Sequence, residues 1–148
     1  MRYPIQITAN PLIGPLLRGF GVRRGNSYVE LKGGALTIRM GCWFNETVPL
    51  GEIASMAPSE WPWWGGFGVR LAPRQGVAVV ASTQGVVNIG LKRPCRMSIL
   101  IVPRNAENLW VSLEDPDGFL RALSEATGLP VSPFVSFWGK ALSEATAS

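Results

Sequence analysis

The sequence predicts a mainly β domain of the α+β class that ends in a helix. Three observations predict it: apolar and polar residues alternate along most of the chain, turns rich in glycine and proline separate these runs, and one clear helical pattern begins at Pro116. Eight or nine short strands of this kind favour a closed or nearly closed antiparallel sheet. A length of 148 residues fits a single domain with one core.

The first two of these strands form a hairpin in this prediction. Val29 and Leu31 alternate with polar neighbours, Gly33 and Gly34 supply the turn, and alternation resumes over residues 36–40. Further strands are expected over residues 43–50, 53–56, 67–71, 77–81, 87–92, 97–101 and 109–113. The break between two of them falls at Pro94, and alternation along the last one turns Trp110 outward, where C-terminal helices could cover it.

The helix predicted over residues 116–127 has the clearest start and stop signals in the chain. Asp115 is a good N-cap, Pro116 suits the first helical position, and Gly128 ends the helix. One side is lined by Phe119, Leu120, Leu123 and Thr127. Because the last strand runs into this helix almost without a loop, the apolar side is positioned to cap an open end of the sheet.

A second, short C-terminal helix is predicted by a weaker signal. Ser132 and Pro133 open a segment in which apolar residues recur on one side, interrupted by Gly139. These residues are Phe134, Trp138, Ala141 and Ala145.

Positive charge is concentrated in the first two thirds of the chain. Residues 1–50 hold six basic and two acidic side chains, residues 51–100 hold five and two, and residues 101–148 hold three and six. Such a basic body could attract an anionic membrane surface, although an ordinary solvated surface explains the same excess. Runs of adjacent Lys or Arg do not exceed two residues, which argues against nucleic acid as a partner.

The sequence contains no catalytic or metal-binding signature. Histidine, the commonest proton acceptor near neutral pH, is absent. Cys42 and Cys95 lack the spacing of metal ligands, so neither a metal nor another cofactor is expected. Pro4 and Pro11 interrupt the N-terminal region, which has no apolar run of signal-peptide type, and this favours a cytoplasmic location.

The stretch "WPWWGGFGVRLAP" is the candidate binding surface. Trp61, Trp63 and Trp64 could insert into a lipid surface or stack on a sugar or on a partner's apolar patch. Arg70 and Arg74 would then meet headgroup phosphates. The alternative is a plug that closes one end of the core, and we favour it because the glycines suit a tight crossing and large exposed apolar patches are uncommon.

A set of sequence blocks carries a family resemblance: a Leu-Thr-Ile-Arg strand, "VPLGEIASM", "WPWWGGFGVRLAP", "GVVNIGLKRP" and "SLEDPDGFLRAL". Together they resemble bacterial proteins with a pleckstrin-homology-like (PH-like) domain, over about residues 18–127. The resemblance implies a bent, seven-stranded, barrel-like antiparallel sandwich with a C-terminal helix closing one end, and no enzyme activity. Within a single domain, 1–148, residues 1–17 are then an N-terminal extension and residues 128–148 an accessory helix.

The resemblance also bears on ligands. Eukaryotic relatives of this family often bind phosphoinositides through a basic cluster between the first two strands. In this chain that loop is Gly33–Gly34, flanked only by Lys32 and, further on, Arg39, which argues against phosphoinositide recognition.

Two classes of function follow from the sequence. The first is a cytoplasmic, non-enzymatic interaction module that binds a protein partner or an anionic membrane surface, with a homo-oligomer left open. The second is a small barrel that encloses an apolar ligand, or a small enzyme without histidine. It predicts a cavity of ~300 Å³ or more into which polar groups such as Arg70, Glu46 or Asn88 converge.

Overall fold

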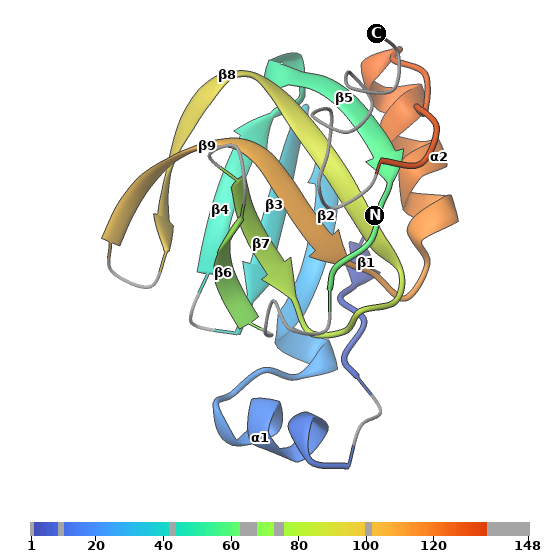
Figure 1. Ribbon diagram of the computed structural model, residues 1–148. Coiled ribbons are helices and arrows are strands. Elements are labelled where there is room, and N and C mark those ends of the chain that lie inside the picture. Colours follow the sequence, from blue (N-terminus) through green and yellow to red (C-terminus); the bar gives the residue numbers. More distant parts are fainter. Residues whose placement is uncertain are drawn as a thin grey trace, which may run out of the picture.

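The protein folds into two β-sheets that pack face to face, with α2 beside them and α1 at one end of the molecule (Figure 1). The computed structural model describes residues 2–8, 11–41, 44–62, 68–72, 76–99 and 102–135. The strands are β1 (Arg2–Pro4), β2 (Ser27–Lys32), β3 (Ala35–Met40), β4 (Phe44–Pro49), β5 (Ile53–Pro58), β6 (Gly68–Ala72), β7 (Gly76–Val80), β8 (Val86–Ile99) and β9 (Val102–Ser112). The helices are α1 (Ile13–Gly19) and α2 (Pro116–Thr127), with short 3-10 turns η1 (Arg24–Asn26) and η2 (Leu50–Glu52). The predicted mainly β, α+β class is confirmed.

The first sheet has the order β1-β2-β3-β4 and is antiparallel throughout. Its central hairpin turns at Gly33 and Gly34, whose φ angles of 60° and 75° lie in the left-handed region that favours glycine. The predicted hairpin is therefore confirmed. Strand β1, which comes from the predicted N-terminal extension, pairs with β2 and places Tyr3 in the core.

The second sheet has the order β5-β8-β9-β7-β6. Strands β8 and β9 form an antiparallel hairpin. Strand β9 also pairs with β7, and these two strands run parallel. The sequence predicted a wholly antiparallel sheet, and this prediction is wrong for the pair β7–β9. Isolated bridges from Ile5 to Leu113 and from Ile7 to Ala81 tie the N-terminal segment to this sheet. Within the described ranges the strands form two sheets and no closed barrel.

Strand β8 is a single strand of 14 residues, where the sequence predicted two strands separated by Pro94. Its pairing with β9 shifts between Gly90 and Cys95, so residues 91–94 stand opposite the single residue Glu107. Proline has no N–H for the ladder and is tolerated where a bulge already interrupts it. The predicted break is wrong because the proline lies in this bulge.

Each face of the second sheet carries buried apolar side chains. The main core lies between the two sheets and includes Leu36, Ile38 and Phe44 from the first sheet and Val79, Ile89, Leu109 and Val111 from the second. A second buried cluster consists of Trp61, Ala78, Val80, Val86 and Trp110. Trp110 thus points away from the main core, as alternation predicts. The predicted cover by C-terminal helices is not what α2 provides, because the buried residues of α2 belong to the main core. Trp61 packs in the same cluster as Trp110 instead.

Helix α2 has the predicted boundaries and caps. The Asp115 side chain accepts a hydrogen bond from the backbone N–H of Gly118 (3.1 Å), and Gly128 ends the helix with a φ of 75°. Its buried residues are Phe119, Leu120 and Leu123. Because these side chains enter the main core, α2 covers the sandwich on the side where Figure 1 shows it beside β5.

The chain after α2 runs along the edge of β5 instead of starting a helix. The backbone N–H of Ser132 donates to the carbonyl of Met56 (2.8 Å), and that of Val135 donates to Pro58 (2.9 Å). The predicted helix start at Ser132–Pro133 is therefore wrong, because the edge of a sheet offers these backbone groups partners in an extended conformation. The rest of the predicted helix, residues 136–148, lies outside the described residues.

Candidate functional site

The tryptophan stretch that the sequence marks as a candidate surface is described only in part. Trp61 is 3% exposed and packs in the second buried cluster. Arg70 lies in β6, but its side chain is outside the description. Three further candidates, Trp63, Trp64 and Arg74, lie outside the described residues. Trp61 is thus part of the interior, and a binding role for the other four residues stays a prediction.

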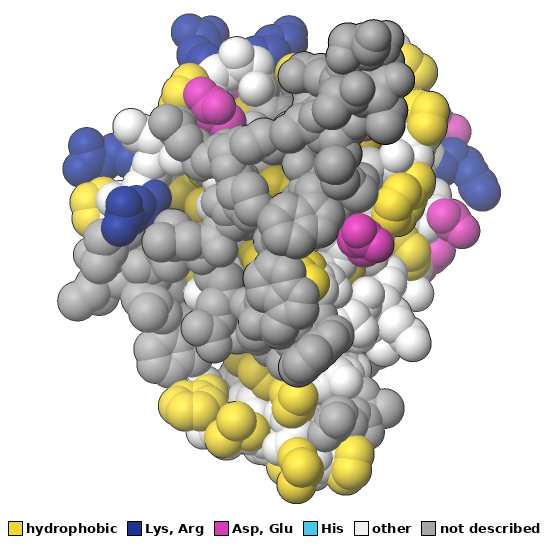
Figure 2. Space-filling view, in the orientation of Figure 1, with side chains coloured by type: hydrophobic (Ala, Val, Ile, Leu, Met, Phe, Trp, Pro, Cys, Tyr) yellow, Lys and Arg dark blue, Asp and Glu magenta, His cyan; other side chains and the backbone are white. Residues whose placement is uncertain are grey.

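A different apolar surface is formed by helix α1. Leu12, Leu16 and Phe20 follow one another at intervals of four residues, so they share one side of the helix. They are 82%, 59% and 56% exposed, and we call these three side chains the α1 tip. Figure 2 shows hydrophobic side chains gathered at the end of the molecule where Figure 1 places α1. Exposed apolar patches of this kind mark interaction sites more often than single exposed residues do.

The opposite side of α1 attaches the helix to the body of the protein. Leu17 and Val22 are buried in the main core, and Ile13 packs partly against it. Gly14 is also buried, and a Cβ added there would lie 3.0 Å from the carbonyl oxygen of Thr8, so the glycine permits a close approach. The helix is thus apolar on two sides, of which the molecule itself covers one.

Positive charge accompanies the α1 tip. Arg18 lies in the last turn of α1 and Arg23 follows it, and both side chains are exposed. No acidic residue occurs before Glu30. The Glu30 carboxylate accepts a hydrogen bond from Nε of Arg2 (2.7 Å), which lowers the pKa of Glu30. Residues 11–29, which include the α1 tip, therefore carry basic side chains and no acidic ones.

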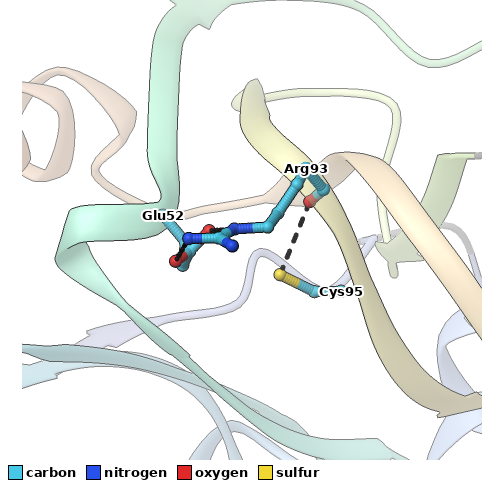
Figure 3. A network of polar contacts seen from close by, with 3 residues as sticks. All are labelled: Glu52, Arg93 and Cys95. Carbon is cyan, nitrogen blue, oxygen red and sulfur yellow. Dashed lines mark hydrogen bonds and ion pairs between the residues drawn. The ribbon is translucent and has the colours of Figure 1, made fainter.

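Glu52, Arg93 and Cys95 form a polar group where η2 meets the bulge of β8 (Figure 3). Nε and Nη2 of Arg93 donate to the two carboxylate oxygens of Glu52 (2.8 and 2.9 Å), and these bonds lower the pKa of Glu52. The Cys95 thiol donates to the carbonyl of Arg93 (3.7 Å), and burial raises the pKa of this thiol. These contacts join η2 to the bulge of β8.

Of the polar residues predicted to converge in a ligand-enclosing barrel, Glu46 lies in β4 of the first sheet and Asn88 in β8 of the second, and the Arg70 side chain is outside the description. Glu46 accepts a hydrogen bond from the backbone N–H of Ser98 (3.0 Å), which ties β4 to the far half of β8. Asn88 is buried and donates to the carbonyl of Leu109 (3.4 Å). Among the described residues, no group of three or more Cys, Asp or Glu side chains is arranged to hold a metal ion.

A scan against protein-family models and searches among curated proteins and solved structures found no match to this chain. The chain's own surfaces are therefore the basis for assigning a function. In the part of the chain that the structure describes, no helix is both long and apolar enough to cross a bilayer.

Proposed function

We propose that the protein is a non-enzymatic binding module that attaches to anionic membrane surfaces through the α1 tip. One observation carries the proposal: Leu12, Leu16 and Phe20 are more than half exposed on one side of a helix that also bears Arg18. Interfacial helices bind in this way, with an apolar side inserted at the headgroup boundary and basic side chains near anionic lipids.

The apolar contribution sets the scale of the affinity. Burying a whole Leu or Phe side chain contributes about 1.5–3 kcal/mol, so burying the exposed fractions of the α1 tip would contribute roughly 3–6 kcal/mol. Arg18 and Arg23 would add about 1 kcal/mol each near an anionic surface. The sum corresponds to dissociation constants between roughly 0.2 mM and 1 μM. We therefore expect attachment that is reversible and sensitive to salt.

In the same proposal, the domain is a PH-like interaction module. Two packed sheets and a C-terminal helix over one side of the sandwich support this assignment. The nine described strands and the parallel β7–β9 pair depart from a seven-stranded antiparallel plan. Because one fold hosts many functions, the membrane role rests on the α1 tip and not on the fold.

The test is flotation of the full chain with lipid vesicles. We expect the protein to float with vesicles of phosphatidylcholine and phosphatidylserine at low salt, and not with phosphatidylcholine alone. Phe20→Ser should weaken the binding about ten-fold, since it removes one inserted ring. Phe134→Ser is the matched control, because Phe134 is 57% exposed, about the same as Phe20, but lies on the C-terminal segment.

Three outcomes would contradict the proposal. The first is that the wild-type chain fails to float with anionic vesicles at low salt. The second is that Phe134→Ser weakens flotation as much as Phe20→Ser does. The third is that sedimentation shows association between copies of the chain and that Phe20→Ser separates these copies. The α1 tip would then be an interface between copies instead of a membrane contact.

A further inference from the structure

The outer face of the second sheet carries a hollow lined by both polar and apolar residues, and the α1 tip is not part of it. The hollow has a volume of about 510 Å³, and its described lining comes from β5, β8, β9 and the segment that follows α2. This volume lies within the range of small-molecule binding sites, about 300–1,000 Å³.

The floor of the hollow is a row of residues across three adjacent strands. Backbone register places Ser55 of β5 opposite Gly90 of β8, and Gly90 opposite Asn108 of β9. Gly90 lets the Ser55 side chain lie over the middle of the row, because a Cβ added at position 90 would lie only 2.4 Å from Oγ of Ser55. The same Cβ position is 3.9 Å from Oδ1 of Asn108, so the Ser55 hydroxyl and the Asn108 amide oxygen lie close together above Gly90.

A second amide lies beside this row. Asn88 also lines the hollow, two residues before Gly90 on the same face of β8. Its amide nitrogen donates to the carbonyl of Leu109 at 3.4 Å, a long hydrogen bond. A side-chain amide has two N–H donors and a carbonyl acceptor, so Asn88 keeps hydrogen-bonding capacity for a ligand.

The wall of the hollow comes from the segment that runs along β5. Pro133 and Phe134 line it, and Phe134 keeps most of its ring exposed. Glu107 is the charged residue among the described lining, which includes no Lys or Arg. The described lining therefore offers hydroxyl, amide and carboxylate groups beside an aromatic ring, a set that favours a neutral ligand over an anion.

We propose that this hollow binds a neutral polyhydroxylated ligand, a mono- or disaccharide. Each sugar hydroxyl both donates and accepts a hydrogen bond, which matches Ser55 and the two asparagine amides. The Glu107 carboxylate accepts further hydroxyl donors, and the apolar C–H face of a sugar ring can lie against Phe134. The inference is independent of membrane attachment, because it uses none of the residues of the α1 tip.

The test follows the side-chain amide signals of Asn88 and Asn108 by NMR in the full chain. The probes are glucose, galactose, mannose, N-acetylglucosamine and maltose at up to about 50 mM, which detects millimolar dissociation constants. We expect at least one sugar to shift both signals. Gly90→Ala should weaken the response about ten-fold or more, because the added methyl group would displace the Ser55 hydroxyl from the floor. Gly51→Ala, where an added Cβ has no other atom within 4 Å, is the matched control and should respond as the wild type does.

The proposal is overturned if none of the sugars shifts the two signals in the wild-type chain, or if Gly90→Ala leaves the response unchanged. Shifts caused by inorganic phosphate or by the diamine putrescine, but not by sugars, would also overturn it, because they would show a site for charged ligands. If Gly90→Ala does not fold, Asn108→Ala replaces it, with the signal of Asn88 as the readout. Asn105→Ala, an exposed position on the same strand, is then the control.

Discussion

Helices α1 and α2 each have a stripe of apolar side chains, but the stripe of α2 is buried in the core and the stripe Leu12, Leu16 and Phe20 at α1 is exposed. The stripe of α2 consists of Phe119, Leu120 and Leu123, all buried in the main core, and side-chain and glycine caps fix both ends of the helix. The stripe that forms the α1 tip is exposed, and Leu12 at the start of α1 makes no side-chain cap. The fold therefore depends on the stripe of α2, whereas the three side chains of the α1 tip stay more than half exposed.

The shortness of α1 strengthens this contrast. A helix of seven residues is not stable by itself in water, so the contacts of its inner side must hold it in place. Leu17 and Val22 supply those contacts in the main core. The α1 tip can thus be changed without removing what keeps the helix attached.

Phe119→Ala should have the largest effect of the changes that test this comparison. The Phe119 ring is fully buried and meets the ring of Tyr3 edge-on, with centroids 5.3 Å apart. We expect a loss of about 3–5 kcal/mol in the free energy of unfolding, measured by urea denaturation. Phe20→Ala should stay within about 0.5 kcal/mol of the wild type, since a ring on the surface leaves no cavity. Similar losses in the two variants would break the comparison.

The elements predicted correctly from the sequence are those whose signals lie close together in the chain. Gly33 and Gly34 define the turn of the first hairpin by themselves, and Asp115, Pro116 and Gly128 define both ends of α2. These signals depend on backbone conformations that a few neighbouring residues determine. No distant part of the chain is needed to interpret them.

The elements that the sequence did not reveal depend on distant partners. Pro94 interrupts a strand in isolation, and only the pairing of β8 with β9 shows that it lies in a bulge. The segment at Ser132 has a helix-start pattern, but the edge of β5 pairs with it in an extended form. The hollow is likewise invisible in the sequence, because Ser55 and Asn108 are brought together by strand register.

The sequence contains one signal for the α1 tip and one against it. The spacing of Leu12, Leu16 and Phe20 is helical, but Gly14 and Pro15 argue against a helix in an isolated reading. The structure resolves this conflict, since Pro15 lies in the first turn, where a missing N–H costs no helical bond, and Gly14 meets the backbone at Thr8.

Asp115→Ala should have an intermediate effect and tests the difference in capping. Removing the carboxylate that accepts from the N–H of Gly118 should lower the free energy of unfolding by about 1 kcal/mol. Asp117→Ala in the same first turn is the control, and it should cost only about 0.3–1 kcal/mol through the helix dipole. A cost for Asp115→Ala no larger than that of the control would show that the cap does not distinguish α2 from α1.

The smallest expected effect concerns β1, the strand that leads into α1, and its ion pair between Arg2 and Glu30. The hydrogen bond from Arg2 lowers the pKa of Glu30 below its ordinary value of 4.5, so the pair stabilises the folded state above that pH and loses its effect as the pH falls through the folded pKa. Because the pair is exposed, we expect a difference of only a few tenths of a degree to a few degrees in Tm between the wild type and Glu30→Gln at neutral pH, closing in acid. In an Arg2→Gln background this pH dependence should shrink, since only the attraction of Lys32 and of the N-terminal amine for Glu30 remains. A difference in Tm between the wild type and Glu30→Gln that widens in acid would contradict this sign. The attachment of β1, and through it of α1, would then depend on contacts other than this ion pair.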